Sequence, residues 1–310
     1  MRTLKTSEAA ALLNVSPNTL RAWERRFGYP KPMRSPGKHR LYTHGEVASL
    51  RDALNDGLSI SSAISRARES VRADTHVLTG ALAAYDLARA DQAMEAALAL
   101  RSLERAVEEI MLPSLDEVAD KHGADSAPWA FAASWASEWL QRARRLTPAP
   151  IRQDCVLIGD ATSGSGDAQS LRLRALELFT TRAGARVLTL PVRRMGGLQG
   201  VLDAHGPDAV VLAGDAVSDD EVARWAWAVR SAAGVLPVLL YHRGVRDERH
   251  SAAAGRTLDD QPSVAGPQVL HAIELGMRPD DASGGQFITA GEDRSASQKV
   301  PQRQLRTVSA

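Results

Sequence analysis

The side chains best suited to holding a charged partner gather in the first 45 residues, which contain nine Lys or Arg and only two acidic residues. The whole chain of 310 residues has 38 basic against 37 acidic residues, so the remainder is slightly acidic. Cationic groups concentrated in this way attract an anionic partner such as nucleic acid. A charged face that only keeps the protein in solution is the alternative, and net charge alone does not separate the two.

Residues 16–27 add amide and hydroxyl groups to these cations, and such groups can contact the base edges or the phosphates of DNA. Leu20, Trp23 and Phe27 recur in this run at helical spacing and predict its buried face. The polar side chains left on the other faces are Asn18, Thr19, Arg21 and Arg25.

Two short helices must position these groups. The first is expected to begin at the hydroxyl residues Thr6 and Ser7, which are good N-caps. The second begins at Ser16 or Pro17 after a tight turn, and proline suits a first turn because its missing N–H costs little there. Two such helices joined by a tight turn form a helix-turn-helix.

A β-hairpin wing is predicted after the second helix, which ends at Gly28. Its prolines exclude a helix from residues 29–42. The hairpin turns at Pro36-Gly37, and a further helix begins near His44. The wing residues expected to hold phosphates are Arg34, Lys38, His39, Arg40 and Tyr42.

The run Thr19–Pro30, followed by Arg34-x-x-Gly37-Lys38-His39-Arg40-Leu41-Tyr42, resembles the MerR-type winged-helix head. It is most similar to the subgroup fused to cobalamin-binding-like sensors, the CarH, LitR and MlrA type. The resemblance implies a sequence-specific transcriptional regulator that binds a double-stranded DNA operator as a homodimer or higher homo-oligomer, with RNA polymerase as a further candidate partner. The DNA-binding residues are then Ser16, Asn18, Thr19, Arg21, Arg25, Arg34, Lys38, His39, Arg40 and Tyr42.

The middle of the chain is rich in Ala and Leu with helical periodicity, which predicts a four-helix bundle. Asp91 is expected to cap one helix, and another is expected to run over 103–122 and to contain Pro113. The last helix carries Phe131, Trp135 and Trp139 on one face. This aromatic stripe is either bundle core or one wall of a ligand pocket.

Short apolar runs at 155–159, 186–190, 209–213 and 236–240 alternate with helical stretches, which predicts a doubly wound parallel α/β sheet. Ligands of such sheets bind at the carboxyl ends of the strands. A Gly/Ser loop at 163–167 lies at such an end, but it lacks the third glycine of the dinucleotide pattern and is a weak phosphate signal. The expected domains are a winged helix-turn-helix at 1–72, a helical bundle at 73–148, a cobalamin-binding-like α/β domain at 151–275 and a disordered tail at 276–310.

The resemblance also implies where cobalamin would bind, and this chain departs from the family at those positions. Related domains hold cobalt with the His of an Asp/Glu-x-His-x-x-Gly motif, where this chain has Asp167, Gln169 and Arg172. The helix above carries a Glu-His pair in the relatives and Glu138-Trp139 here. Because an amide is a far poorer cobalt ligand than imidazole, we expect no cobalamin bound through a His ligand.

Another tetrapyrrole or small molecule is an open alternative for this region. Its pocket would use Trp129, Trp135, Glu138, Trp139, Asp167 and Gln169. A corrinoid-dependent enzyme or carrier is a further alternative, but the scattered histidines offer no catalytic constellation, so we expect no enzyme. A third alternative is a DNA-bound scaffold that recruits partners through its tail.

The composition of the chain also bears on which metal sites, disulfides and cellular locations can be expected. The single cysteine, Cys155, excludes an internal disulfide and argues against a zinc cluster, and no metal site is expected. The first residues lack the apolar core of a signal peptide, and no run approaches the ~18 apolar residues of a membrane span. A cytoplasmic location is therefore predicted.

Overall fold

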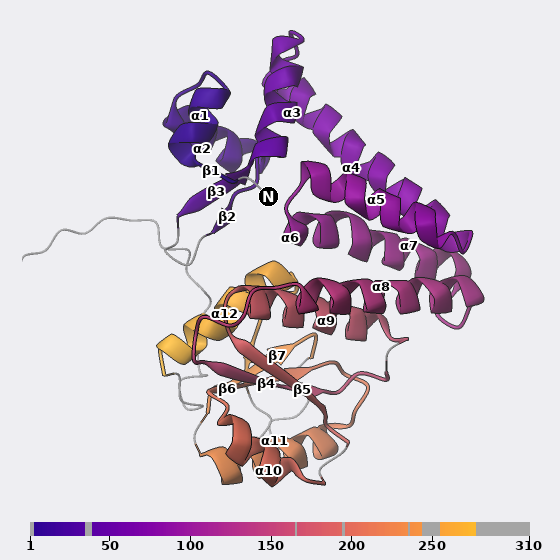
Figure 1. The fold of residues 1–310 in the computed structure, drawn as a ribbon, viewed down its shortest axis with the longest axis vertical. Coiled ribbons are helices and arrows are strands. Elements are labelled where there is room, and N and C mark those ends of the chain that lie inside the picture. The colour runs from indigo at the N-terminus through magenta and orange to yellow at the C-terminus, as the bar shows by residue number, and fades with distance from the viewer. Residues whose placement is uncertain are drawn as a thin grey trace, which may run out of the picture.

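The computed structural model describes residues 3–34, 39–164, 166–193, 196–234, 236–243 and 255–276. The predicted disordered tail lies outside these residues apart from its first position. Three regions follow one another along the longest axis, with a small head at one end, a layer of helices in the middle and an α/β region at the other end (Figure 1).

The head combines the two predicted helices with a small antiparallel sheet in the order β1-β3-β2. Its elements are β1 (Thr3–Lys5), α1 (Thr6–Leu12), α2 (Pro17–Phe27), β2 (Met33–Arg34), β3 (Arg40–Thr43) and α3 (His44–Asn55). The Ser16 side chain accepts a hydrogen bond from the Thr19 backbone, and Gly28 ends α2 with a φ of 65°, a conformation that favours glycine. The helix-turn-helix and the strands of the wing are therefore both present as predicted.

The middle layer is built from α4 (Ile60–Ala83), α5 (Leu87–Leu100), α6 (Leu103–Ala106), η1 (Val107–Met111), α7 (Leu112–His122) and α8 (Ala127–Arg145). Helix α4 runs through the predicted domain boundary at 72/73, so the head and the bundle share one continuous helix. Asp86, not Asp91, caps α5. Asp91 instead accepts a hydrogen bond from the Trp135 indole at 2.9 Å, a tertiary contact that local sequence does not reveal.

The helix predicted over 103–122 is interrupted by the π-helical turn η1. Pro113 follows this turn and has no N–H to donate to the Glu109 carbonyl four residues earlier. The Thr75 hydroxyl of α4 donates to that carbonyl instead, at 3.3 Å. A side chain from a neighbouring helix thus satisfies the group that the proline leaves without its usual partner.

The α/β region contains a parallel sheet in the order β5-β4-β6-β7-β8, which confirms the predicted doubly wound class. Its elements are β4 (Cys155–Asp160), α9 (Ala168–Arg182), β5 (Arg186–Pro191), α10 (Leu198–His205), β6 (Ala209–Ala213), α11 (Asp219–Ala233), β7 (Val238–Tyr241), β8 (Arg256–Thr257) and α12 (Pro262–Glu274). Strand β8 has only two residues, too few for a hydrophobic pattern, and the sequence did not predict it.

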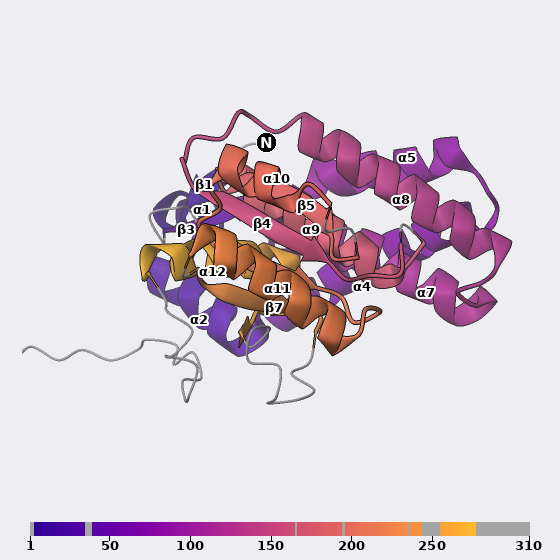
Figure 2. The same cartoon turned by 90° about the horizontal axis from the view of Figure 1, so that it is seen from below.

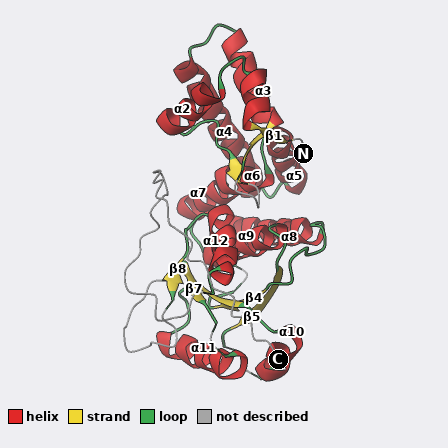
Figure 3. Cartoon of the chain, turned by 90° about the vertical axis from the view of Figure 1, so that its left-hand side faces the viewer, coloured by secondary structure: helices red, strands yellow, loops and turns green. Residues whose placement is uncertain are grey.

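Helices α9 and α12 cover one face of the sheet, and α10 and α11 cover the other (Figures 2 and 3). The strand residues alternate accordingly. Val156 and Ile158 of β4 pack toward α9 and α12, while Leu157 between them packs toward α10 and α11.

Helix α9 is buried on two sides because it lies between the sheet and the bundle. Leu173 and Leu176 face the sheet core. Leu171, Leu178 and Phe179 belong instead to the core of the bundle. The bundle and the α/β region therefore share one apolar layer.

Candidate nucleic-acid interface and ligand site

The outer face of α2 carries the side chains that the sequence assigns to DNA. Asn18, Arg21 and Arg25 are exposed. Leu20 on the opposite face is fully buried and anchors the helix in the head. Within the described parts of the chain, neither Arg21 nor Arg25 takes part in an ion pair, so both guanidinium groups are available to a ligand.

Ser16 and Thr19 sit at the start of α2 and hold its first turn. Their hydroxyl oxygens lie 2.8 Å apart, and the Ser16 oxygen also accepts from the Thr19 N–H at 3.0 Å. The cap fixes the direction in which the first turn points its N–H groups. That end of a helix favours an anion such as a phosphate.

The wing strand β3 is tied to α2 by one carboxylate. The Arg40 Nε lies 3.1 and 3.0 Å from the two oxygens of Glu24. The Tyr42 hydroxyl donates to the same carboxylate at 3.4 Å. Residues two apart on a strand share a face, so Arg40 and Tyr42 both point toward α2.

Tyr42 differs from the expectation that it contacts phosphate, because its side chain lies in the core of the head with no exposed surface. Burial, followed by the charge of Glu24, raises the pKa of its hydroxyl. His39, which immediately precedes β3, is exposed. The Arg34 side chain and Lys38, both predicted phosphate contacts, lie outside the described residues.

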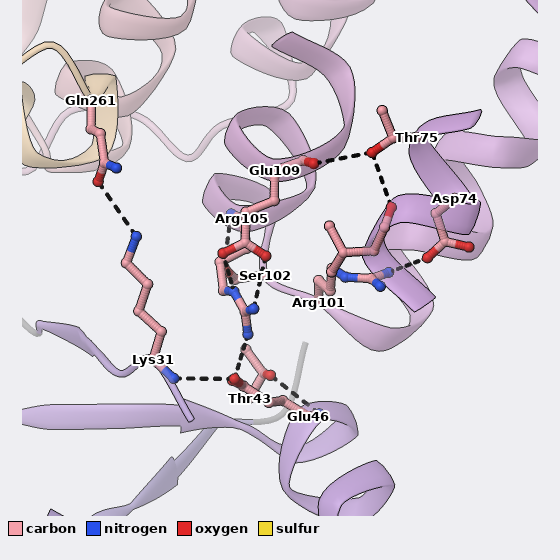
Figure 4. A network of polar contacts seen from close by, with 11 residues as sticks. Lys31, Thr43, Glu46, Asp74, Thr75, Arg101, Ser102, Arg105, Glu109 and Gln261 are labelled. Atoms are coloured by element: carbon pink, nitrogen blue, oxygen red, sulfur yellow. Dashed lines mark hydrogen bonds and ion pairs between the residues drawn. The ribbon is translucent and has the colours of Figure 1, made fainter. Parts of the chain in front are cut away.

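A buried ionic cluster, which no local sequence pattern predicted, joins the head to the bundle (Figure 4). Glu46 of α3 accepts from the Lys31 backbone at 3.1 Å and pairs with the Arg105 guanidinium at 2.5 Å. The same guanidinium donates to Glu109 through two hydrogen bonds of 2.8 Å. Burial raises the pKa of Glu46, and the neighbouring Arg105 opposes that shift.

Two further contacts fix this junction. Arg101 pairs with Asp74 at 2.7 Å. A Cβ atom at Gly45 would lie 2.8 Å from the backbone oxygen of Leu100, so only glycine lets α3 approach the end of α5 this closely. The head is thus held in one orientation by a charged cluster and by a close backbone contact.

The loop before α9 is closed by its own side chains. Asp167 caps α9 by accepting from the Gln169 N–H at 2.9 Å and from the Ser163 N–H and hydroxyl at 3.0 Å each. The Gln169 side-chain oxygen accepts from the Asp215 N–H at 3.0 Å and so ties the loop after β4 to the loop after β6. Arg172 pairs with Asp116 of α7 at 2.7 Å.

These contacts answer whether the loop suits cobalamin. The Gln169 oxygen, at the place of the family's His, is engaged by a backbone N–H, and Arg172 crosses to the bundle where the family has glycine. The residues present do not fit a corrinoid ligated from this loop.

The aromatic residues of α8 lie in the bundle core more than in a pocket wall. Trp129 and Trp135 are 3% and 5% exposed, and Trp139 packs against the same core. The Trp129 indole donates to the Gly166 carbonyl at 2.8 Å, which brings α8 to the Gly/Ser loop as the predicted pocket requires. Glu138 is exposed and pairs with Arg142 at 2.7 Å.

A cavity of about 330 Å³ does open between α8 and this loop. Of the six predicted pocket residues, only Glu138 lines it. The rest of the lining comes from the neighbouring α8 face and the loop, namely Ala130, Ala133, Ser134, Ser137, Gln141 and Gly166. This small space lies beside the aromatic stripe, and the other five predicted pocket residues do not line it.

Comparison with known proteins decides what the head is. Residues 5–42, from the end of β1 to β3, match the family described as MerR family regulatory protein. The head is a MerR-type helix-turn-helix domain. This match confirms the resemblance on which the assignment of the α2 and wing residues depends.

Relatives of the MerR-type head extend the match into the rest of the chain. The HTH-type transcriptional repressor CarA of Myxococcus xanthus is 29% identical over 227 residues, which cover 68% of this chain and 76% of CarA. The repressor CarH of the same organism is 29% identical over 143 residues, 39% of this chain and 48% of CarH. The regulator MlrA of Escherichia coli (strain K12) is 39% identical over 57 residues, 17% of this chain and 24% of MlrA.

A solved cobalamin-binding protein from Desulfitobacterium hafniense DCB-2 aligns with 63% of this chain and 96% of its own length, at 13% identity and a TM-score of 0.32.

Among the described residues, no helix is both long and apolar enough to cross a membrane.

Proposed function

We propose that this protein is a transcriptional regulator that binds duplex DNA through α2 of its MerR-type head. The observation that carries the proposal is the outer face of α2, where Asn18, Arg21 and Arg25 are exposed and both arginines are without an ion pair in the described residues. Arginine is the side chain that most often reads guanine edges, and it also holds phosphates. The names of the relatives, transcriptional repressors and a transcriptional regulator, support the same function.

The protein acts as a homodimer on an operator with two half-sites. A single head presents one recognition helix, and paired heads are the usual way for a helix-turn-helix to read a site of adequate length. The wing of each head lies beside its α2 because Arg40 pairs with Glu24. We assign His39 and the wing cations to phosphates.

The bundle sets the orientation of the head, and thereby the fit of a dimer to its operator. Glu46 and Arg105 join the head to the bundle at 2.5 Å. Glu108, from the same π-helical turn as Glu109, accepts from the Ser263 N–H and hydroxyl at 2.7 and 2.9 Å. This turn therefore lies between the start of α12 in the α/β region and the DNA-binding head, so a change in the α/β region has a short path to the head.

DNA binding is tested by selecting bound duplexes from a randomised pool with the full chain. We expect enrichment of one pseudo-palindromic motif. Arg21→Ala then weakens binding to that motif at least tenfold in fluorescence anisotropy, since a good bidentate contact to a base is worth about 1–3 kcal/mol. Arg142→Ala, an exposed arginine on α8, is the matched control and keeps the wild-type affinity. Failure of the wild-type chain to enrich any motif, even at low salt, contradicts the proposal.

A further inference from the structure

A second and larger concave space lies away from the Gly/Ser loop, between α8, α9 and the edge strand β5. It measures about 650 Å³. Polar residues one turn apart on α9 face it, although α9 is otherwise apolar on two sides. They are Ser170, Arg174, Glu177 and Thr181.

The acidic member of this stripe is already neutralised within the protein. Glu177 is buried and pairs with Arg144 of α8 at 3.1 Å, and it also accepts from the Thr189 hydroxyl of β5. The second nitrogen of Arg144 donates to the Val187 carbonyl at 2.7 Å. These contacts make one rigid wall in which neither Glu177 nor Arg144 needs a ligand.

Arg174, unlike Glu177 and Arg144, has a buried donor that is not bound within the described part of the protein. Its Nε is buried and has no hydrogen-bond partner among the described residues. Buried polar groups in native proteins nearly always have partners, so an orphaned buried N–H marks a place where an acceptor is missing. Arg145 of α8 adds an exposed cation to the lining, and Asp160 at the end of β4 is the remaining acid.

We propose that this cleft binds a small oxyanion, a carboxylate or a phosphate, whose oxygens accept hydrogen bonds from the guanidinium of Arg174. A guanidinium presents its donors in a planar fork that matches both groups. Arg145 stands at the exposed side of the cleft to attract the anion, and the Ser170 hydroxyl offers a neutral contact on the preceding turn of α9.

The position of the cleft gives the anion a consequence for the whole chain. Its lining comes from the bundle through α8 and from the α/β region through α9 and β5. An anion held there contacts both regions at once and stabilises their present arrangement. Only this regulatory meaning rests on the proposed function, because binding of the anion itself does not require DNA.

Calorimetric titration of the full chain tests the site, with inorganic phosphate and citrate as separate probes and ionic strength held constant with chloride. We expect saturable binding at one site per chain for at least one probe. Phosphate alone would indicate a phosphate ester as the natural class, citrate alone a carboxylate, and both a general oxyanion site.

Arg174→Gln is expected to lower the affinity at least tenfold, and Arg145→Gln to lower it less because that side chain is exposed. Arg142→Gln, on α8 but outside the cleft lining, keeps the wild-type affinity. Thermal unfolding of each variant verifies that it is folded. Absence of saturable binding of either probe, or equal affinities of wild type and both cleft variants, overturns the proposal, while the separate DNA selection shows whether the head still functions.

Discussion

The two sides of the helical bundle are joined to their neighbours around different centres, one charged and one apolar. Toward the head, the junction is a buried charged cluster centred on Arg105, between Glu46 and Glu109. Toward the α/β region, the centre of the junction is apolar, because Leu178 and Phe179 of α9 belong to the bundle's own core, and ion pairs such as Arg172–Asp116 lie beside it. One side joins two units through directional bonds, whereas the other merges two units into one core.

This difference teaches what each junction can do. The stabilisation from apolar packing is non-directional and increases with the apolar area removed from water. The junction with the α/β region therefore mainly contributes stability. A buried ion pair contributes little net stability over an apolar equivalent, but it demands one geometry and is costly when a partner is lost. The junction with the head is therefore suited to holding the head in one orientation.

The largest effect is expected from Arg105→Met. It leaves the Glu46 carboxylate buried without its cation, which costs about 3–5 kcal/mol of unfolding free energy. The double variant Arg105→Met with Glu46→Leu removes both charges and is expected to recover most of that loss. Urea unfolding of both variants measures the difference, and an equal loss in the two would contradict the account of the charged junction.

A somewhat smaller loss is expected from Leu178→Ala at the apolar junction. Leu178 is fully buried between α9 and the bundle, and such truncations cost about 2–5 kcal/mol through lost transfer energy and the cavity left behind. Leu146→Ala is the control, because that side chain is 80% exposed. A midpoint in urea that matches the control would show that the two regions do not share a core.

The smallest effect is expected from an exposed ion pair in the same bundle. Hydrogen bonds from Lys121 and then Thr79 lower the pKa of Glu117 below its usual value. A carboxylate with a lowered folded-state pKa stabilises the protein above its unfolded pKa, near 4.5, and loses that contribution as the pH falls through the folded value. Solvent screening keeps the effect below ~1 kcal/mol.

Unfolding by urea at pH 7 and pH 3 checks this expectation. Glu117→Gln should lose slightly less stability than the wild type between the two pH values, while Glu95→Gln, an exposed carboxylate on α5, behaves like the wild type. An acid response of Glu117→Gln larger than that of the wild type would reverse the assigned sign.

Much of the head could be predicted because its signals are local. Ser16 caps α2, Gly28 ends it and Leu20 faces inward, and each of these follows from residues within one or two turns. The errors arose where a distant partner competes for a side chain. The sequence predicts a cap at Asp91, yet Asp91 binds the Trp135 indole on another helix. It also predicts a DNA contact for Tyr42, yet the Tyr42 hydroxyl donates to Glu24 of α2.

The features of the candidate sites also divide into those that local residues predict and those that depend on distant partners. The absence of an imidazole at Gln169 could be read from one motif, but the bond from the Asp215 N–H to its side chain required the sheet to bring two loops together. The cleft beside β5 had no sequence signal, because its walls come from α8, α9 and β5. Arg174 looks like any helical arginine until its surroundings are known.

The sequence by itself determined the helix-turn-helix of the MerR-type head and the parallel class of the sheet, because periodicity, caps and prolines act over a few residues. Only the tertiary structure decided that Arg105 holds Glu46 inside the junction and that the Arg174 Nε, beside β5, has no hydrogen-bond partner among the described residues. The physical reason is that the environment of a charge depends on which segments surround it, and those segments are brought together by packing between residues far apart in the chain.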